Sequence, residues 1–106
     1  MRSVRAVLFA PGNKERVMIK ALESGADAVI LDLEDSVPIA GKTAARALVE
    51  RTITGGAATA AAAGSGPAIW VRVNGAASRL LADDQAAVVR PGLDAVLLPK
   101  VESVAE

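Results

Sequence analysis

Short apolar runs alternate with amphipathic stretches along the whole chain. Four of these runs have the length of a buried strand and end in polar or turn-forming residues. They span residues 4–10, 26–33, 68–73 and 95–98. Nearly continuous apolar runs of this length are typical of parallel strands, which are covered on both faces. The pattern predicts four strands of one parallel sheet.

The stretches between these runs carry apolar residues at helical spacing. Residues 14–24 predict an amphipathic helix that Asn13 caps and Gly25 ends. A second helix is expected after Pro38, and residues 80–89 predict a third, weaker one. In the second helix the inner positions are Ala44, Ala45, Leu48 and Val49, and the outer ones Lys42, Arg46, Glu50 and Arg51. The element order is βαβαβαβ.

Residues 54–66 are almost wholly Ala, Gly, Ser and Thr. The alanines could extend the second helix, or the stretch could be a loose connection. Its compositional bias favours a mobile connection. We therefore expect one domain over residues 1–106, with an Ala/Gly-rich connection at about 54–66.

An internal repeat supports the alternating order. Residues 25–31 and 92–98 share the pattern Gly-x-Asp-Ala-Val-aliphatic-Leu, 67 residues apart. This offset corresponds to about two βα units of a parallel sheet. Chance similarity between two buried strands is the alternative explanation.

Polar residues follow the predicted strands at their carboxyl ends. They are Asp32, Glu34, Asp35, Arg72, Asn74, Lys100 and Glu102. A (β/α)₈ barrel builds its active rim from successive strand ends. An open doubly wound sheet binds ligands mainly at a switch point, and neither a GxGxxG nor a Walker motif is present. Because a complete barrel takes about 250 residues, we expect an α/β fold that is the N-terminal half of a (β/α)₈ TIM barrel, in a truncated chain.

Composition excludes several classes of function. The chain has no cysteine and no histidine, which excludes disulfides, thiolate or imidazole metal sites, and Ser-His or Cys-His nucleophile pairs within it. Twelve basic residues balance twelve acidic ones, and only one Trp, one Phe and no Tyr occur, so we expect no nucleic-acid partner. No apolar stretch reaches the roughly 20 residues of a membrane span, and no export signal is seen. We expect a cytoplasmic protein without a membrane partner.

Three carboxylates lie within four positions, at Asp32, Glu34 and Asp35. At about 5 Å and an effective dielectric near 20, each pair repels by roughly 3 kcal/mol, so a cation is expected. Strand alternation places Asp32 and Glu34 on one side and Asp35 on the other, so a shared role requires a turn by Glu34. The cluster could cap the next helix and face water, or it could form a magnesium environment.

Arg72 lies at the end of an apolar strand, on the same side as Trp70 and Asn74 by alternation. An interior arginine requires an anion. That anion could be a substrate carboxylate, which the planar guanidinium can bind through two parallel hydrogen bonds. It could also be Asp32 or Glu34, in an ion pair inside the protein. For Lys100 and Glu102, a surface ion pair is the favoured interpretation.

Four motifs in order carry a resemblance to a known family. They are LFAPGN at residues 8–13, GADAVILDLEDSV at 25–37, VRVN at 71–74 and GLDAVLLPKVES at 92–103. This series resembles the citrate lyase beta subunit branch of the HpcH/HpaI aldolase superfamily. The resemblance spans nearly the whole chain and fails only around residues 54–66.

The resemblance implies a TIM-barrel lyase, a homo-oligomer and often a trimer. Such an enzyme uses Mg²⁺ to cleave or form a carbon–carbon bond in citryl-CoA, malyl-CoA or a similar 3-hydroxyacyl thioester. It implies that Arg72 binds the substrate carboxylate and the developing oxyanion, and that Glu34 and Asp35 are acidic neighbours of the magnesium waters. Asn13 and Lys14 would approach the CoA-binding mouth.

The direct magnesium ligands of the family belong to later strands and are expected beyond Glu106, so none is named here. Activity of the chain alone is therefore not expected. Two other functions are considered: a noncatalytic half-barrel that needs a partner chain, and a metal-dependent aldolase that acts on free keto acids without coenzyme A.

Overall fold

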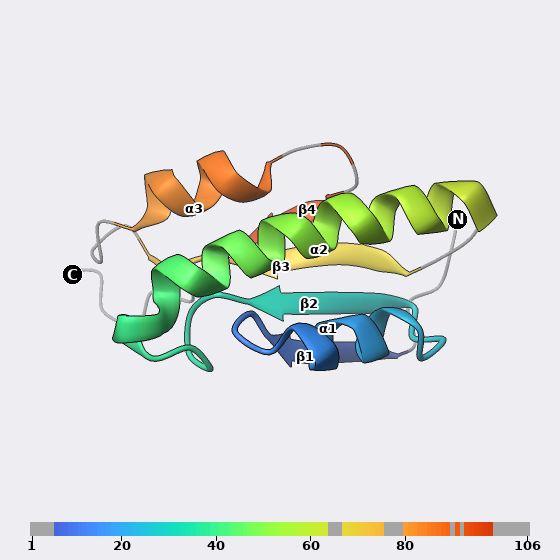
Figure 1. Cartoon of the computed structure of the whole chain (residues 1–106), viewed down its shortest axis with the longest axis horizontal. Helices are drawn as coiled ribbons and strands as arrows, with labels where there is room; N and C mark the ends of the chain where they lie inside the picture. Colours follow the sequence, from blue (N-terminus) through green and yellow to red (C-terminus); the bar gives the residue numbers. More distant parts are fainter. Residues whose placement is uncertain (1–5, 64–66, 76–79, 90, 92, 99–106) are drawn as a thin grey trace.

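The computed structural model describes residues 6–63, 67–75, 80–89, 91 and 93–98, with residues 56–63 described by their backbone only. Its four parallel strands form one sheet in the order β1-β2-β3-β4 (Figure 1). The strands are β1 (Val7–Pro11), β2 (Ala28–Asp32), β3 (Ala68–Arg72) and β4 (Ala95–Leu97). The helices are α1 (Glu15–Leu22), α2 (Lys42–Ala63) and α3 (Leu81–Val88), with a short 3₁₀ helix, η1 (Ile39–Gly41), before α2.

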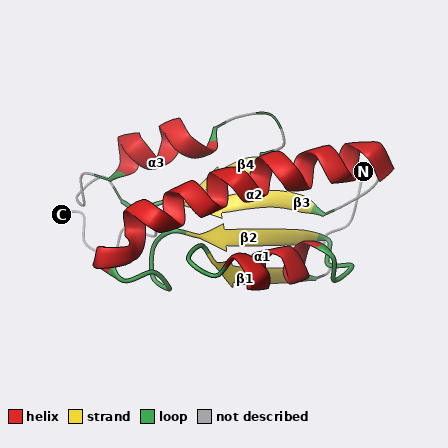
Figure 2. Ribbon diagram, viewed as in Figure 1, coloured by secondary structure: helices red, strands yellow, loops and turns green. Residues whose placement is uncertain are grey.

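The helices α1, α2 and α3 lie on the same face of the sheet (Figures 1 and 2). Each strand pairs with the next one along the chain, and crossovers between parallel strands are right-handed. Repeating this step in one direction places every crossover helix on the same side. This is the arrangement of a (β/α)₈ barrel wall, with the helices outside and the other face of the sheet inside. The described fold is thus the predicted α/β one, a partial TIM barrel.

The core lies between the helices and the sheet. Alternate residues of the strands, among them Val29, Leu31, Ile69 and Val71, point toward the helices and are buried. The helices contribute Met18, Ala21, Ala45, Val49, Ile53 and Val88 to the same cluster. The intervening strand residues face the inner side, where Phe9, Ile30 and Trp70 lie in register across β1, β2 and β3.

The prediction of a loose connection at 54–66 is wrong for residues 54–63, because α2 continues to Ala63; residues 64–66 lie outside the described residues. Alanine has the highest helix propensity, and six of these ten residues are alanine. The hydroxyl groups of Thr52 and Thr54 donate to the carbonyls four residues earlier, at 2.8 and 3.1 Å, so both are satisfied by the backbone of α2 itself. No helix in the described ranges is long and apolar enough to cross a membrane.

The two aspartates of the internal repeat make the same contacts. Asp27 Oδ2 accepts from Ala6 N at 3.0 Å, and Asp27 N donates to Ala6 O at 3.0 Å. Asp94 Oδ2 accepts from Ile69 N at 2.7 Å, and Asp94 N donates to Ile69 O at 2.8 Å. Each aspartate therefore ties the amino end of its strand to the strand before it in the sheet, which gives the repeat a structural meaning.

Candidate functional site

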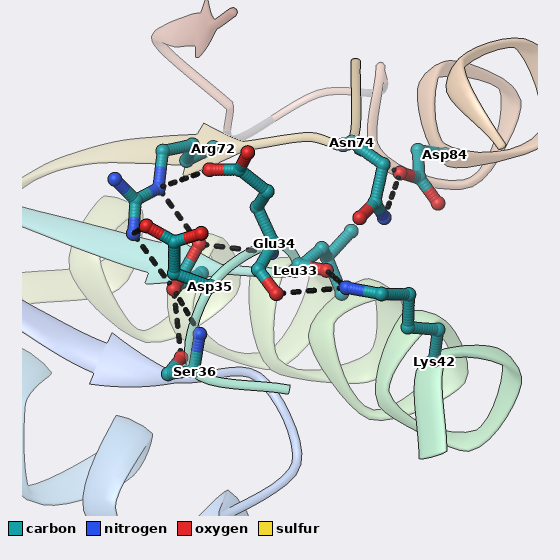
Figure 3. Close-up of polar contacts among 9 residues, drawn as sticks. Leu33, Glu34, Asp35, Ser36, Lys42, Arg72, Asn74 and Asp84 are labelled. Atoms are coloured by element: carbon teal, nitrogen blue, oxygen red, sulfur yellow. Dashed lines mark hydrogen bonds and ion pairs between the residues drawn. The ribbon is translucent and has the colours of Figure 1, made fainter. Parts of the chain in front are cut away.

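Asp32 and Arg72 meet where β2 and β3 end. The strand register pairs them directly, and Pro11 and Leu97 continue the same row. Arg72 Nε donates to Asp32 Oδ1 and Nη2 to Oδ2, both at 2.9 Å, which is the fork-to-fork geometry of a strong ion pair (Figure 3). The sequence left open a substrate carboxylate or an internal carboxylate as the anion of Arg72. In the structure Arg72 binds the internal carboxylate of Asp32.

Asp32 also organises the loop that follows it. Its Oδ1 accepts from Glu34 N at 2.9 Å, and its Oδ2 accepts from Ser36 N at 3.0 Å and Ser36 Oγ at 2.7 Å. Burial alone would raise the pKa of Asp32, but the hydrogen bonds from Arg72, Glu34 and Ser36 outweigh it and hold that pKa well below its ordinary value. Asp32 is therefore an ionised anchor with its lone pairs occupied.

Glu34 and Asp35 approach the same guanidinium. Glu34 Oε1 lies 3.5 Å from Arg72 Nε, and Asp35 Oδ2 lies 3.8 Å from Nη2. The chain turns after Asp32, so these carboxylates gather around one cation, as a shared role requires. They do not cap the next helix, since the N-cap residue of η1 is Pro38 and no side chain makes a capping hydrogen bond there. Their side chains are 27% and 76% exposed, so both can accept further hydrogen bonds.

Arg72 is held on one side and open on the other. Its contacts with the three carboxylates use Nε and Nη2, and its Cζ lies 5.2 Å from the ring centroid of Phe9, a cation–π distance. The hydrogen bonds to Asp32 raise the pKa of Arg72 further, so the charge is permanent. The side chain is 25% exposed. A ligand carboxylate would therefore meet a cation whose plane is already oriented.

Asn74 belongs to a second polar cluster and does not contact Arg72. Its backbone N and its Nδ2 donate to Asp84 Oδ2 at 2.9 and 2.7 Å. Arg46 Nε donates to Asp84 Oδ1 at 2.9 Å, and the Asp84 side chain is 1% exposed. Arg46 Nη2 is buried without a hydrogen-bond partner among the described residues. This cluster ties the end of β3 to α2 and α3.

Asn13 and Lys14 lie in the loop after β1, at the same edge of the sheet. The prediction that Asn13 caps α1 is wrong: Lys14 occupies the cap position, and no side chain makes a capping bond. Asn13 Oδ1 is buried without a partner in the described part of the chain, whereas Lys14 is exposed. Their approach to a CoA mouth stays a prediction. Lys100 and Glu102 lie outside the described residues.

The residues of this edge do not form a complete metal site. Within the described ranges no three Asp or Glu side chains are placed to hold an ion together. Asp32 has its oxygens occupied, and Glu34 and Asp35 lie against Arg72. The exposed carboxylate oxygens of Glu34 and Asp35 suit hydrogen bonds from metal-bound water rather than direct coordination.

Sequence reasoning missed several residues of this edge, and their signals can be named. Phe9 lies on the same face of the sheet as Asp32. Pro11 is the register partner of Asp32, and Phe9 lies two residues before Pro11, so strand alternation places it on that face. Asp84 lies four residues from both Leu80 and Val88, so it is a charge on an apolar helix face. Lys42 was expected outside, and this is wrong, since it is 8% exposed. No sequence signal indicated Ser36.

Comparison with known proteins gives a consistent result. The sequence matches the HpcH/HpaI aldolase/citrate lyase family over residues 5–106. A citrate lyase subunit beta-like protein of Deinococcus radiodurans is 41% identical over 103 residues, which are 97% of this chain and 35% of that protein. A (3S)-malyl-CoA thioesterase of Cereibacter sphaeroides is 41% identical, with 96% and 34% covered. The chain thus spans about a third of the length of these relatives.

Solved structures agree. The CitE protein of Mycobacterium tuberculosis in complex with magnesium and acetoacetate superposes with a TM-score of 0.69 and 33% identity, over 99% of this chain and 41% of that one. The same protein with magnesium, acetoacetate and coenzyme A gives a TM-score of 0.65 and 32% identity, with 99% and 36% covered. The family match and these likenesses agree with the motifs of the sequence: the chain belongs to the HpcH/HpaI aldolase/citrate lyase family.

Proposed function

We propose that this chain supplies the carboxylate-binding part of a Mg²⁺-dependent lyase active site. The reaction is aldol- or Claisen-type cleavage or formation of a carbon–carbon bond in citryl-CoA, malyl-CoA or a similar 3-hydroxyacyl-CoA. The observation that carries the proposal is the meeting of Arg72 with Asp32, Glu34 and Asp35. This cluster lies at the carboxyl edge of the sheet, where barrel enzymes build their active sites.

Arg72 is the substrate-binding group in this proposal. Asp32 holds its Nε and Nη2, so the guanidinium needs little reorganisation when a carboxylate arrives at its free side. Cleavage of a carbon–carbon bond next to a carbonyl leaves negative charge on oxygen, and a permanent cation stabilises that charge. Phe9, which packs against the guanidinium, limits the directions from which a ligand can approach it.

In this proposal the described residues contact magnesium only through its bound water molecules. Glu34 and Asp35 would accept hydrogen bonds from the waters of the ion, and residues outside the described part of the chain would coordinate it directly. When bound, the ion polarises the substrate oxygen as a Lewis acid. Support comes from the CitE protein of Mycobacterium tuberculosis, whose solved complexes contain magnesium. A trimeric assembly and a cytoplasmic location stay predictions.

A chimeric enzyme tests the proposal. This chain would replace the corresponding third of the citrate lyase subunit beta of Leuconostoc mesenteroides, and cleavage of the carbon–carbon bond of citryl-CoA would be measured with and without Mg²⁺. We expect a Mg²⁺-dependent activity that Arg72→Ala lowers by about 100-fold or more in kcat/KM. Arg51→Ala, a change in an exposed ion pair, is the control and should leave the rate unchanged. Equal rates for Arg72→Ala and the unmodified chimera would remove Arg72 from the mechanism.

Free keto acids are the second candidate substrates. The CitE protein of Mycobacterium tuberculosis has been solved with magnesium and acetoacetate, and with oxaloacetate and magnesium. The carboxylate of such an acid could bind Arg72 in the same way as that of a thioester substrate. Coenzyme A dependence separates the two: an aldolase of free acids would turn over a keto acid at the same rate whether or not coenzyme A is added.

A further inference from the structure

Lys42, the first residue of α2, is buried although it carries a charge. Only 8% of the residue is exposed. Its Nζ donates to Leu33 O at 2.9 Å and to Glu34 O at 2.7 Å (Figure 3). Both acceptors are backbone carbonyls of the loop between β2 and η1. The ammonium group therefore holds the backbone next to the acidic residues.

Two successive carbonyls meet at this one nitrogen. In an extended strand successive carbonyls point in opposite directions, so the contact requires the chain to turn at Leu33 and Glu34. The amide groups of the same two residues are also held, because Leu33 N donates to Arg72 O and Glu34 N to Asp32 Oδ1, both at 2.9 Å. With both sides of each residue held, the backbone of Glu34 is fixed, and with it the direction in which its Cα–Cβ bond leaves the chain.

The charge of Lys42 acts against helix electrostatics and with those of the loop. A cation at the first position of a helix faces the positive end of the helix dipole, which disfavours it. Asp32, Glu34 and Asp35 carry three negative charges against the single positive charge of Arg72, a formal balance of −2. Lys42 reduces that balance to −1. The net negative charge of the loop therefore favours a buried cation at this position, whereas the helix dipole disfavours one.

We infer that Lys42 is a positioning residue, whose ammonium group holds the loop after β2 in the turn that presents Glu34 to Arg72. It acts through the two carbonyls and does not contact the ligand. The significance of this role rests on the proposed function. The contacts themselves involve no ligand, so they can be tested separately from it.

The test is ¹⁵N NMR of the Arg72 side chain in the ligand-free protein that contains this chain. Lys42→Met keeps the length of the side chain and removes its charge and its donors. Arg72 Nε donates to Asp32 Oδ1 and lies 3.5 Å from Glu34 Oε1. When the loop relaxes we expect both contacts to weaken, so the Nε proton should exchange with water about tenfold faster and its chemical shift should move. Arg51→Met is the matched control on the same helix. The Arg51 side chain is 65% exposed and pairs with Glu15, so the Arg72 signal should stay unchanged.

If Lys42→Met does not fold, Lys42→Gln replaces it, because the amide retains one donor; a smaller change in the same direction is then expected. Exchange of the Arg72 proton within about twofold of the unmodified rate, in whichever variant folds, would overturn the role of Lys42. That result would leave Arg72 as the proposed substrate group. An inactive chimera, in contrast, would count against the proposed function and leave the NMR result standing.

Discussion

The two edges of the sheet use aspartate in different ways. At the amino edge, Asp27 and Asp94 bind backbone groups of the neighbouring strand. At the carboxyl edge, Asp32 and Asp84 each bind an arginine that lies 40 and 38 residues away in the sequence. The first arrangement repeats within a short motif and ties strands together. The second assembles charges from distant elements, which is where a barrel places chemistry.

Loss of the carboxylate of Asp84 should have the largest effect on stability. Asp84→Ala removes the carboxylate that accepts from Arg46 Nε, and with it the acceptor of two hydrogen bonds that Asn74 donates. Removing one partner of a buried ion pair costs about 3–5 kcal/mol. Denaturant unfolding monitored by circular dichroism measures this loss of unfolding free energy.

The neighbouring residue supplies the control. Asp83 lies in the same first turn of α3 and is exposed, so Asp83→Ala should change the unfolding free energy by less than about 0.5 kcal/mol. Equal effects of the two substitutions would show that the buried cluster does not stabilise the carboxyl edge.

Gly12→Ala should be the next most harmful change. Gly12 N donates to Asp32 O at 2.7 Å, and a Cβ at this position would lie 2.6 Å from the same oxygen and 2.9 Å from a methyl group of Val49. The backbone of β2 would have to move, at a cost of about 3 kcal/mol. Thermal unfolding should show a clear fall in Tm.

Gly55→Ala makes the comparison sharper. Gly55 lies in α2, and a Cβ there would meet nothing within 4 Å. Alanine favours the helix by about 1 kcal/mol over glycine, so this variant should raise Tm. If both substitutions lowered Tm alike, close packing around Gly12 would not be the cause.

Local pattern predicted the strands and helices well, because strand and helix periodicity depend on neighbouring residues. It failed for residues 54–63, where the compositional bias of the stretch 54–66 suggested a loose connection and the helix propensity of alanine prevailed. Lys42 was placed outside because a charged residue in an amphipathic helix usually faces water. Its burial depends on the carbonyls of Leu33 and Glu34, and no helical pattern contains information about that loop.

The candidate site was predicted only in part, because its placement at one edge follows from the sequence pattern but its internal contacts do not. The placing of Asp32, Glu34, Asp35 and Arg72 at one edge follows from parallel strands, whose carboxyl ends coincide. The expected need for a cation among the carboxylates was met by Arg72 itself. Which of its two alternative anions Arg72 binds depends on the register of β2 and β3, and a single sequence contains no signal for that register.

Lowering the pH should reduce the contribution of Asp32 to the free energy of unfolding. Burial opposes ionisation of this carboxyl, yet Arg72, Glu34 and Ser36 hold its pKa below the ordinary value. A group with a lowered folded-state pKa stabilises fully above its unfolded pKa, near 4, and the stabilisation is lost as the pH falls below that value. Asp32→Asn should therefore cost about 2 kcal/mol at pH 7 and progressively less in acid.

Urea unfolding at pH 7, 5 and 3 would measure the gap between Asp32→Asn and the unmodified protein. Asp35→Asn is the matched control, since its side chain is 76% exposed and an exposed ion pair contributes about 0–1 kcal/mol. A gap for Asp32→Asn that stays constant down to pH 3 would contradict the role of its charge.

The smallest effects are expected at the amino edge. Asp94→Ala removes one acceptor, that of Ile69 N, and leaves the backbone bond from Asp94 N to Ile69 O in place. A single hydrogen bond of this kind contributes about 1 kcal/mol. Asp27→Ala removes the equivalent acceptor of Ala6 N, and its loss should be of similar size because the two geometries match. In the chimeric enzyme neither substitution should alter kcat/KM once the protein is folded, whereas changes at Arg72 should. A loss of turnover without a loss of unfolding free energy in Asp94→Ala would break the division between a structural amino edge and a chemical carboxyl edge.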